Sequence, residues 1–312
     1  MADLYEAIAR RSYLTVSPLE SYHTKTTLMK PAISPKALIF LIATALFSAT
    51  LFRVGGFLKN LIMLAPGLGA VVATAMTDRN WKAFGWKFSL KYVSLAWLLP
   101  ILYAGLAYAC IWILGIGDVP NPLFLERARL TMGIDSDSAP VIITLAFLYI
   151  SLFMLIPSAV FALGEELGWR GLLFPELNKS FSFLKAASIS GLIWGVWHLP
   201  GILFDGYGEG STPFAFRFSM FLLLILFTGI TMAWLWFKSG SIWAVAVFHA
   251  SHNVVIQMFF DRITLDKEYT EYFKGEFGLA LVVTSFVLAF LVINNVWAYT
   301  GKMAKAQGSR AE

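Results

Sequence analysis

Three ionisable side chains interrupt one of the apolar segments of this sequence. Glu165, Glu166 and Arg170 lie in the stretch FALGEELGWRGLLFPEL, where apolar residues resume after the charges. We therefore expect one helix to continue past them, with Gly164 and Gly168 at i,i+4 spacing so that a neighbouring helix can approach closely. An ionisable group buried in lipid costs about 2.5 to 3.5 kcal/mol, so three of them together predict a functional site.

Histidines occur in two further apolar segments. His198 follows WGVW, and His249 and His252 belong to FHASHN, which ends at Asn253. At 1.5 Å per residue, His198 lies about 18 Å along its helix, His249 about 10 Å and Asn253 about 16 Å. These depths place the side chains in the same half of a bilayer as the glutamates, so we expect them to converge.

Helical spacing assigns different roles to these residues. Glu166 and Arg170 are i,i+4 and can pair on one face, whereas Glu165 is rotated about 100° away and stays available for chemistry. His249 and Asn253 share a face in the same way. The candidate catalytic residues are therefore Glu165, His198, His249 and Asn253, and the supporting pair is Glu166 with Arg170. His252 is interpreted as a packing residue or a support for the site rather than as a ligand.

Two mechanisms of hydrolysis use a carboxylate, two imidazoles and an amide. In the first, Glu165, His198 and His249 would bind zinc and leave one position open for water, which the metal acidifies. In the second, Glu165 and His198 deprotonate water directly, while His249 and Asn253 stabilise the oxyanion. The sequence favours the second mechanism because, unlike HExxH, no motif here presents two ligands on one rigid turn. Zinc remains the alternative.

The composition requires lipid around these elements. Of the 312 residues, 58% are hydrophobic and 14% are charged, against roughly 45–50% and 25% in soluble proteins. The single cysteine, Cys110, excludes an internal disulfide and a Cys-rich zinc module. No basic cluster is interleaved with stacking aromatic residues, so we expect no nucleic-acid partner. The chain is therefore predicted to be an all-α polytopic membrane protein.

About eight transmembrane helices are predicted. Two runs, Ala37–Phe52 and Leu61–Met76, fall just under the usual span length, and each is either a short span or a re-entrant piece. Six runs are long enough to cross roughly 30 Å of hydrocarbon. They are Tyr92–Leu114, Val141–Leu163, Ala186–Phe204, Ser219–Phe237, Ile242–Phe260 and Phe277–Tyr299.

The distribution of lysine and arginine predicts the orientation. With eight spans and an internal N-terminus, 16 basic residues fall on the inner side and 8 on the outer side. Basic residues concentrate on the cytosolic side of membrane proteins, so we expect both termini in the cytosol. The predicted parts are a cytosolic tail over 1–36, one transmembrane domain over 37–300 and a cytosolic tail over 301–312. A bacterial plasma membrane is the expected location.

The three motifs resemble those of a known family. GEELGWRG, WGVWHLP and SGSIWAVAVFHASHN are similar, in this order, to the EExxxR, FxxxH and HxxxN motifs of the CPBP intramembrane proteases. This family contains the type II CAAX prenyl endopeptidases and bacteriocin-processing or immunity proteins. The resemblance covers roughly 61–260. One departure is Trp194, which replaces the Phe of FxxxH, an aromatic exchange that hardly disturbs the assignment of the motif.

The resemblance implies an eight-helix intramembrane endopeptidase whose site faces the cytosol and cleaves a membrane-associated or lipidated substrate. Glu165 then corresponds to the catalytic base and His198 to the histidine that helps activate water. His249 and Asn253 correspond to the groups that hold the substrate carbonyl. The family leaves metal dependence open, because its members have been interpreted both as metalloproteases and as glutamate proteases.

Non-enzymatic functions use the same polar cluster. The alternatives are a noncatalytic immunity factor and a membrane protein with an intramembrane cation or proton site. The sequence favours the enzyme, because a noncatalytic descendant has no need of all four candidate residues. The expected partners are a peptide or protein substrate and the bilayer. The sequence names neither the natural substrate nor the oligomeric state.

Overall fold

The computed structural model describes residues 33–54 and 60–308, with side chains over 33–54 and 61–295. The predicted tail over 1–36 therefore lies almost wholly outside the described residues. Most of the described chain is helical, and a two-stranded antiparallel pair, β1 (Gly117–Asp118) with β2 (Leu265–Asp266), links two loops. The prediction of an all-α polytopic membrane protein is confirmed.

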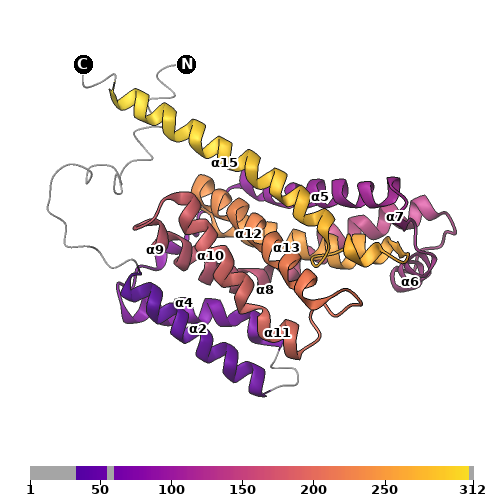
Figure 1. The fold of residues 1–312 in the computed structure, drawn as a ribbon, viewed down its shortest axis with the longest axis horizontal. Coiled ribbons are helices and arrows are strands. Elements are labelled where there is room, and N and C mark those ends of the chain that lie inside the picture. The colour runs from indigo at the N-terminus through magenta and orange to yellow at the C-terminus, as the bar shows by residue number, and fades with distance from the viewer. Residues whose placement is uncertain (1–32, 55–59, 309–312) are drawn as a thin grey trace. The chain divides into compact units, whose positions relative to one another are not determined.

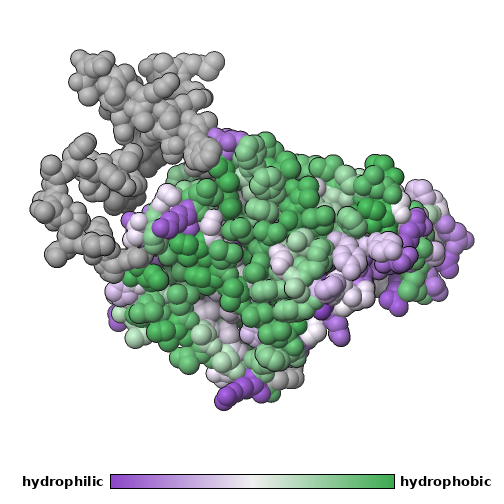
Figure 2. Space-filling view, in the orientation of Figure 1, coloured by the Kyte–Doolittle hydropathy of each residue, from purple (hydrophilic) through white to green (hydrophobic). Residues whose placement is uncertain are grey.

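Six helical segments among the described residues are long and apolar enough to cross a membrane. Hydrophobic side chains cover much of the face that Figure 2 shows, while hydrophilic ones gather toward the end where α6 (Pro122–Met132) lies. The first predicted run, Ala37–Phe52, falls just under the usual span length, but helix α2 extends it at both ends to 20 residues, Pro35–Val54. The six segments are Pro35–Val54, Leu90–Ile113, Ala139–Asn178, Phe183–Phe204, Phe214–Ser239 and Ile242–Ile263.

Two shorter apolar helices complete the set. Helix α4 (Ala65–Met76) follows a 3-10 turn, η1 (Asn60–Leu64), and packs against α2 and α8. Helix α15 (Leu279–Gly308) begins two residues after the predicted start of the last run. The total of eight spans stays a prediction, because neither of these apolar stretches reaches full span length within the described side chains.

The longest helical segment changes its winding twice. It consists of α7 (Ala139–Leu148), a π-helical turn η3 (Tyr149–Phe153), α8 (Leu155–Gly168), a second π-helical turn η4 (Trp169–Leu173) and α9 (Phe174–Asn178). The predicted continuation of this helix past the charged residues is confirmed. π-helical turns are rare and are frequently found at functional sites, and η4 contains Arg170.

Helix α13 (Ile242–Asn253) is the most enclosed element and continues through the π-helical turn η5 (Val254–Phe260) and α14 (Asp261–Ile263). In the most apolar stretch of 18 residues within Ile242–Ile263, 72% of the residues are buried, against 22% in the corresponding stretch of α2. It packs mainly on α8 and α5 (Leu90–Ile113). Helix α10 (Phe183–Trp197), with its short extension α11 (Leu199–Phe204), packs on α12 (Phe214–Ser239). Figure 1 shows α8, α10, α12 and α13 close together in the helical layer.

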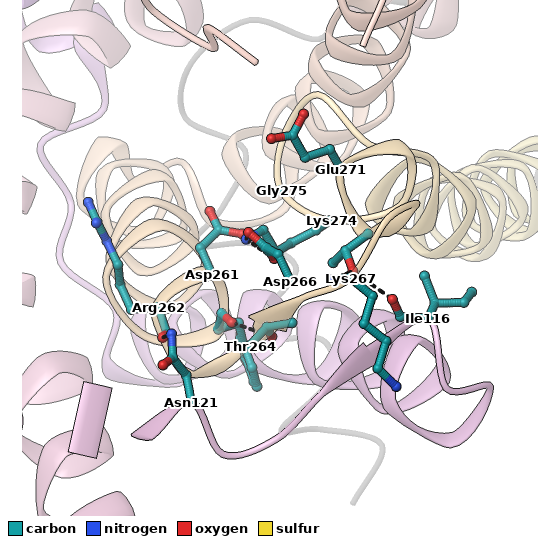
Figure 3. Close-up of polar contacts among 12 residues, drawn as sticks. Ile116, Asn121, Asp261, Arg262, Thr264, Asp266, Lys267, Glu271, Lys274 and Gly275 are labelled. Carbon is teal, nitrogen blue, oxygen red and sulfur yellow. Dashed lines mark hydrogen bonds and ion pairs between the residues drawn. The ribbon is translucent and has the colours of Figure 1, made fainter. Parts of the chain in front are cut away.

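Short loops join the helices at both ends. Beside α4, the 3-10 turn η2 (Trp81–Phe84) leads into a bridge between Trp86 and Ser241. At the opposite end, the 3-10 turn η6 (Thr270–Tyr272) closes the loop after β2, with Thr270 bonded to the Ile116 carbonyl at 2.6 Å. Figure 3 shows this second loop, in which Lys274 reaches Asp266.

Candidate active site

The candidate glutamates lie in the last turn of α8, where close helix packing buries them. Glu165 is 1% exposed and Glu166 is fully buried. A β-carbon on Gly168 would lie 2.7 Å from the Pro66 carbonyl oxygen, so only glycine allows α4 to approach here. A β-carbon on Gly164 would likewise meet Leu64, the last residue of η1. The predicted close approach at both glycines is confirmed.

Glu166 connects two helices through its carboxylate. Arg170 donates from Nη1 to both oxygens of Glu166, at 3.0 and 3.1 Å, as the i,i+4 spacing predicts. His249 on α13 also donates, from Nδ1 to Glu166 Oε1 at 2.9 Å. Sequence reasoning missed this second contact, because the two residues are 83 positions apart. The contact leaves Nε2 of His249 as the ring nitrogen available to a substrate.

Trp194 occupies the centre of the cluster. Its indole Nε1 donates to Glu165 Oε2 at 2.8 Å, and the Arg170 guanidinium lies 4.2 Å from its ring centroid. The imidazoles of His198 and His249 pack against it with centroid separations of 5.7 and 5.3 Å. Trp194 therefore has a contact that the sequence did not predict and that phenylalanine could not make, because phenylalanine has no N–H to donate to Glu165.

His198 forms the junction between α10 and α11. Its Nδ1 donates to the Trp194 carbonyl at 2.9 Å, a contact within one helical turn that fixes the tautomer and leaves Nε2 without the proton. The ring packs between Trp197, Tyr207 and Phe221. An oriented neutral imidazole of this kind can accept a proton from a nearby water.

All four predicted catalytic residues line one cavity of about 1010 Å³. Asn253 is half-buried on its wall, in the last turn of α13 before η5. Most other lining residues are apolar, among them Ala45 on α2, Met63 on η1 and Phe161 on α8. The fold thus brings together in one space the residues that were predicted from three separate motifs.

Several exposed residues of the lining lie at one end of the helices. Arg53 at the end of α2, Phe204 at the end of α11 and Asp205 after it are exposed lining residues. The basic loops, among them the loop that contains Lys82 and Lys87, join the opposite helix ends. These exposed lining residues therefore lie at the helix ends away from that loop.

A second polar cluster lies in the cavity wall and was missed by sequence reasoning. Glu276, which precedes α15, accepts hydrogen bonds from His252 Nε2 at 2.9 Å, Tyr207 at 2.7 Å and Gln257 at 3.0 Å. Tyr103 on α5 bonds to the other ring nitrogen of His252. His252 thus has a defined polar role beyond packing, whereas Glu276 lies far along the chain from every motif and gave no signal.

This cluster separates the large cavity from a smaller one of about 440 Å³ among the loops. Tyr207, Gln257 and Glu276 line both spaces. Figure 3 shows the loops of the smaller space, with Asp261, Glu271 and Lys274 around it. Although burial by itself raises the pKa of Glu276, the hydrogen bond and charge of His252, with the bonds from Tyr207 and Gln257, lower it to about 2.

The donor set does not fit a zinc cage in this arrangement. Among the described residues, no three His, Cys, Asp or Glu side chains are grouped so that they could hold a metal ion. Trp194 packs against both candidate imidazoles and binds the candidate carboxylate. The three predicted ligands thus surround an indole ring.

The fold and the site define a class: a polytopic α-helical membrane protein with buried glutamates, histidines and an asparagine around one intramembrane cavity. Residues 146–255 match the family model of type II CAAX prenyl endopeptidase Rce1-like proteins. All three motifs lie inside this segment. The resemblance predicted from the motifs is therefore confirmed for this part of the chain.

One curated relative is CAAX prenyl protease 2 of Methanococcus maripaludis. It is 35% identical over 107 residues, which cover 33% of this chain and 38% of that protein. The similarity thus spans little more than a third of the relative's length. Helices α2 and α15 and the Glu276 cluster centre lie outside the segment that matches the family model.

Proposed function

We propose that this protein is an intramembrane endopeptidase that hydrolyses a peptide bond of a membrane-associated or lipidated substrate. The observation that carries the proposal is the position of Glu165, which is buried in the wall of a large, mainly apolar cavity together with His198, His249 and Asn253. The matches to a CAAX prenyl endopeptidase family model and to one such protease support the reaction class.

The proposed reaction begins with a water between Glu165 and His198. Glu165 accepts a proton as the water oxygen attacks the carbonyl carbon, and Nε2 of His198 orients the second O–H. The carbonyl oxygen becomes an oxyanion, which the Asn253 amide and Nε2–H of His249 stabilise. His249 must be protonated on both nitrogens for this role, and Glu166 is the counter-ion for that form. Glu165 then gives its proton to the leaving amine as the C–N bond breaks.

The test is Glu165→Gln, which keeps the shape of the side chain but cannot accept the proton. Purified protein in liposomes is assayed with prenylated and unprenylated peptides, and membrane-protein termini from cells are compared by mass spectrometry. Glu176→Gln is the matched control, since Glu176 is a buried carboxylate of the same helical segment and bonds to Ser34. We expect Glu165→Gln to abolish cleavage and Glu176→Gln to retain it. Normal cleavage by folded Glu165→Gln would refute the assignment.

The same assay addresses the non-enzymatic alternatives. An immunity factor or a protein with a cation or proton site would show unchanged termini in both variants. A proton site would instead show proton uptake by liposomes that depends on Glu165. A lower KM for the prenylated peptide than for the unprenylated one would indicate that the apolar cavity wall binds the lipid chain.

Orientation determines which substrates can reach the cavity. The basic-residue asymmetry supports cytosolic termini, and the cavity mouth would then face the other side of a bacterial plasma membrane. The family resemblance supports a cytosolic mouth. Single cysteines at Asp205 and Lys82, in a Cys110→Ser background, distinguish the two by labelling of intact cells with an impermeant thiol reagent. Labelling at Asp205 alone supports cytosolic termini, and labelling at Lys82 alone supports a cytosolic mouth.

Zinc is tested separately. We propose that Glu165 and His198 activate the water without metal. The competing proposal assigns Glu165, His198 and His249 as zinc ligands. Elemental analysis of the purified protein, with cleavage assayed after chelation and after zinc is restored, decides between them. Stoichiometric zinc whose removal abolishes cleavage and whose return restores it would refute the metal-free mechanism.

A further inference from the structure

We propose that Trp194 is a positioning residue that holds one carboxylate oxygen of Glu165 through its indole N–H, and so leaves the other oxygen to accept the proton from water. The inference rests on the proposed function, because it assumes that Glu165 is the base. It differs from the family motif, where the corresponding position is Phe and can donate no hydrogen bond.

The hydrogen bond carries the first step. Trp194 Nε1 lies 2.8 Å from Glu165 Oε2, and both residues are buried, with exposed fractions of 3% and 1%. Among the described residues, no other side chain hydrogen-bonds to Glu165 within the contacts of this site. A single donor on Oε2 fixes the rotation of the carboxyl group and makes its two oxygens chemically unequal.

The indole itself cannot turn away. The Arg170 guanidinium covers its ring at 4.2 Å, a geometry in which a cation is attracted to the aromatic face. The imidazoles of His198 and His249 pack on the same ring in edge-to-face arrangements. Arg170 is in turn bound by both oxygens of Glu166. The supporting pair therefore reaches the base through Trp194.

This arrangement explains why Glu165 and Glu166 perform different roles although they are adjacent. Glu166 binds a cation and an imidazole, so both of its oxygens are occupied. Glu165 receives one neutral donor and keeps one oxygen for the reaction. A base that is preorganised in this way needs little reorientation as the proton moves.

Trp194→Phe removes the N–H and keeps an aromatic ring. We expect kcat to fall about 10-fold, the equivalent of one hydrogen bond to a charged group, with KM changed less than about twofold. The pH profile of kcat/KM should also shift, because the environment of the base changes. Trp97→Phe is the matched control: Trp97 donates to the Ser151 carbonyl at 2.8 Å and does not line the cavity. It should change neither quantity.

A second variant preserves the size of the side chain. Benzothienylalanine at position 194, introduced by codon suppression, keeps the two fused rings but replaces N–H with sulfur. It should reproduce the kinetic loss of Trp194→Phe even where the smaller ring disturbs folding. Wild-type kcat and pH profile in this variant would overturn the proposal.

A spectroscopic measurement tests the hydrogen bond without any activity. In protein labelled with ¹⁵N at the indoles, the Nε1–H resonance absent from Trp194→Phe identifies Trp194. Glu165→Ala should move that resonance to the range of indoles without a strong acceptor, and Glu176→Gln should leave it in place. An unmoved resonance in Glu165→Ala would refute the contact. If Glu165→Gln is fully active while Glu165→Ala moves the resonance, the proposed function is refuted but the hydrogen bond stands.

Discussion

Removal of the Arg170 guanidinium tests the energetics of the buried cluster directly. Arg170→Met keeps much of the side-chain volume but takes away the donor to both oxygens of Glu166, which is fully buried. Glu166 would keep only the hydrogen bond from His249. Breaking a buried ion pair on one side costs about 3–5 kcal/mol, because the remaining charge is uncompensated.

The loss of the cation from the Trp194 ring adds to this cost. A desolvated cation–π contact contributes about 2 kcal/mol, so we expect the free energy of unfolding to fall by about 4 kcal/mol or more for Arg170→Met. Glu166→Gln/Arg170→Met removes the stranded charge, and its loss should be smaller than that of Arg170→Met alone. The two sites are coupled, so the single effects should not add.

The assay is chemical unfolding in detergent micelles, followed by tryptophan fluorescence. Lys179→Met is the control, since the Lys179 side chain is 64% exposed and its pair with Glu176 lies on the same helical segment. We expect that variant to stay within about 0.5 kcal/mol of wild type. The reasoning fails if Arg170→Met is no more destabilising than Lys179→Met, or if the double variant equals the sum of its singles.

Two further predictions concern packing and pH. Gly168→Ala should destabilise the protein by about 1–3 kcal/mol, because the new β-carbon would meet the Pro66 carbonyl. Gly105→Ala is the control and should be neutral or stabilising, since its nearest contact is at 3.7 Å. Thermal unfolding of both variants tests this, and equal stability of the two would contradict the prediction. The low pKa of Glu276, about 2 against an ordinary 4.5, stabilises the fold above about pH 4.5, and this contribution is lost as pH falls toward 2. Wild type should therefore lose thermal stability between about pH 5 and pH 3 more steeply than Glu276→Gln, and parallel profiles would exclude this role.

The sequence predicted the fold because lipid imposes a simple rule. A segment that crosses a bilayer must satisfy its own backbone hydrogen bonds, so long apolar runs become helices whatever their neighbours are. The same rule gave the continuation of the helix past Glu165, since apolar residues resume there. Errors arose at the ends, where α2 extends beyond its apolar run to Pro35 and Val54.

The candidate residues were also visible in the sequence, because ionisable groups are rare in apolar segments and their helical spacing is fixed. The pair Glu166–Arg170 follows from i,i+4 geometry alone. The contact between Glu166 and His249 does not follow from this spacing, because His249 reaches Glu166 from another helix. The same applies to Trp194, whose N–H acquires its role only when α10 packs beside α8.

The sequence alone therefore determined the membrane class, the approximate spans and the identities of Glu165, His198, His249 and Asn253 as a group. Tertiary structure decided the partners of each side chain and the inclusion of Glu276 in the cavity wall. The physical reason is the range of the interactions. Hydropathy and helical spacing act over a few turns of one chain segment, whereas hydrogen bonds between helices depend on rotations and depths that no single segment encodes.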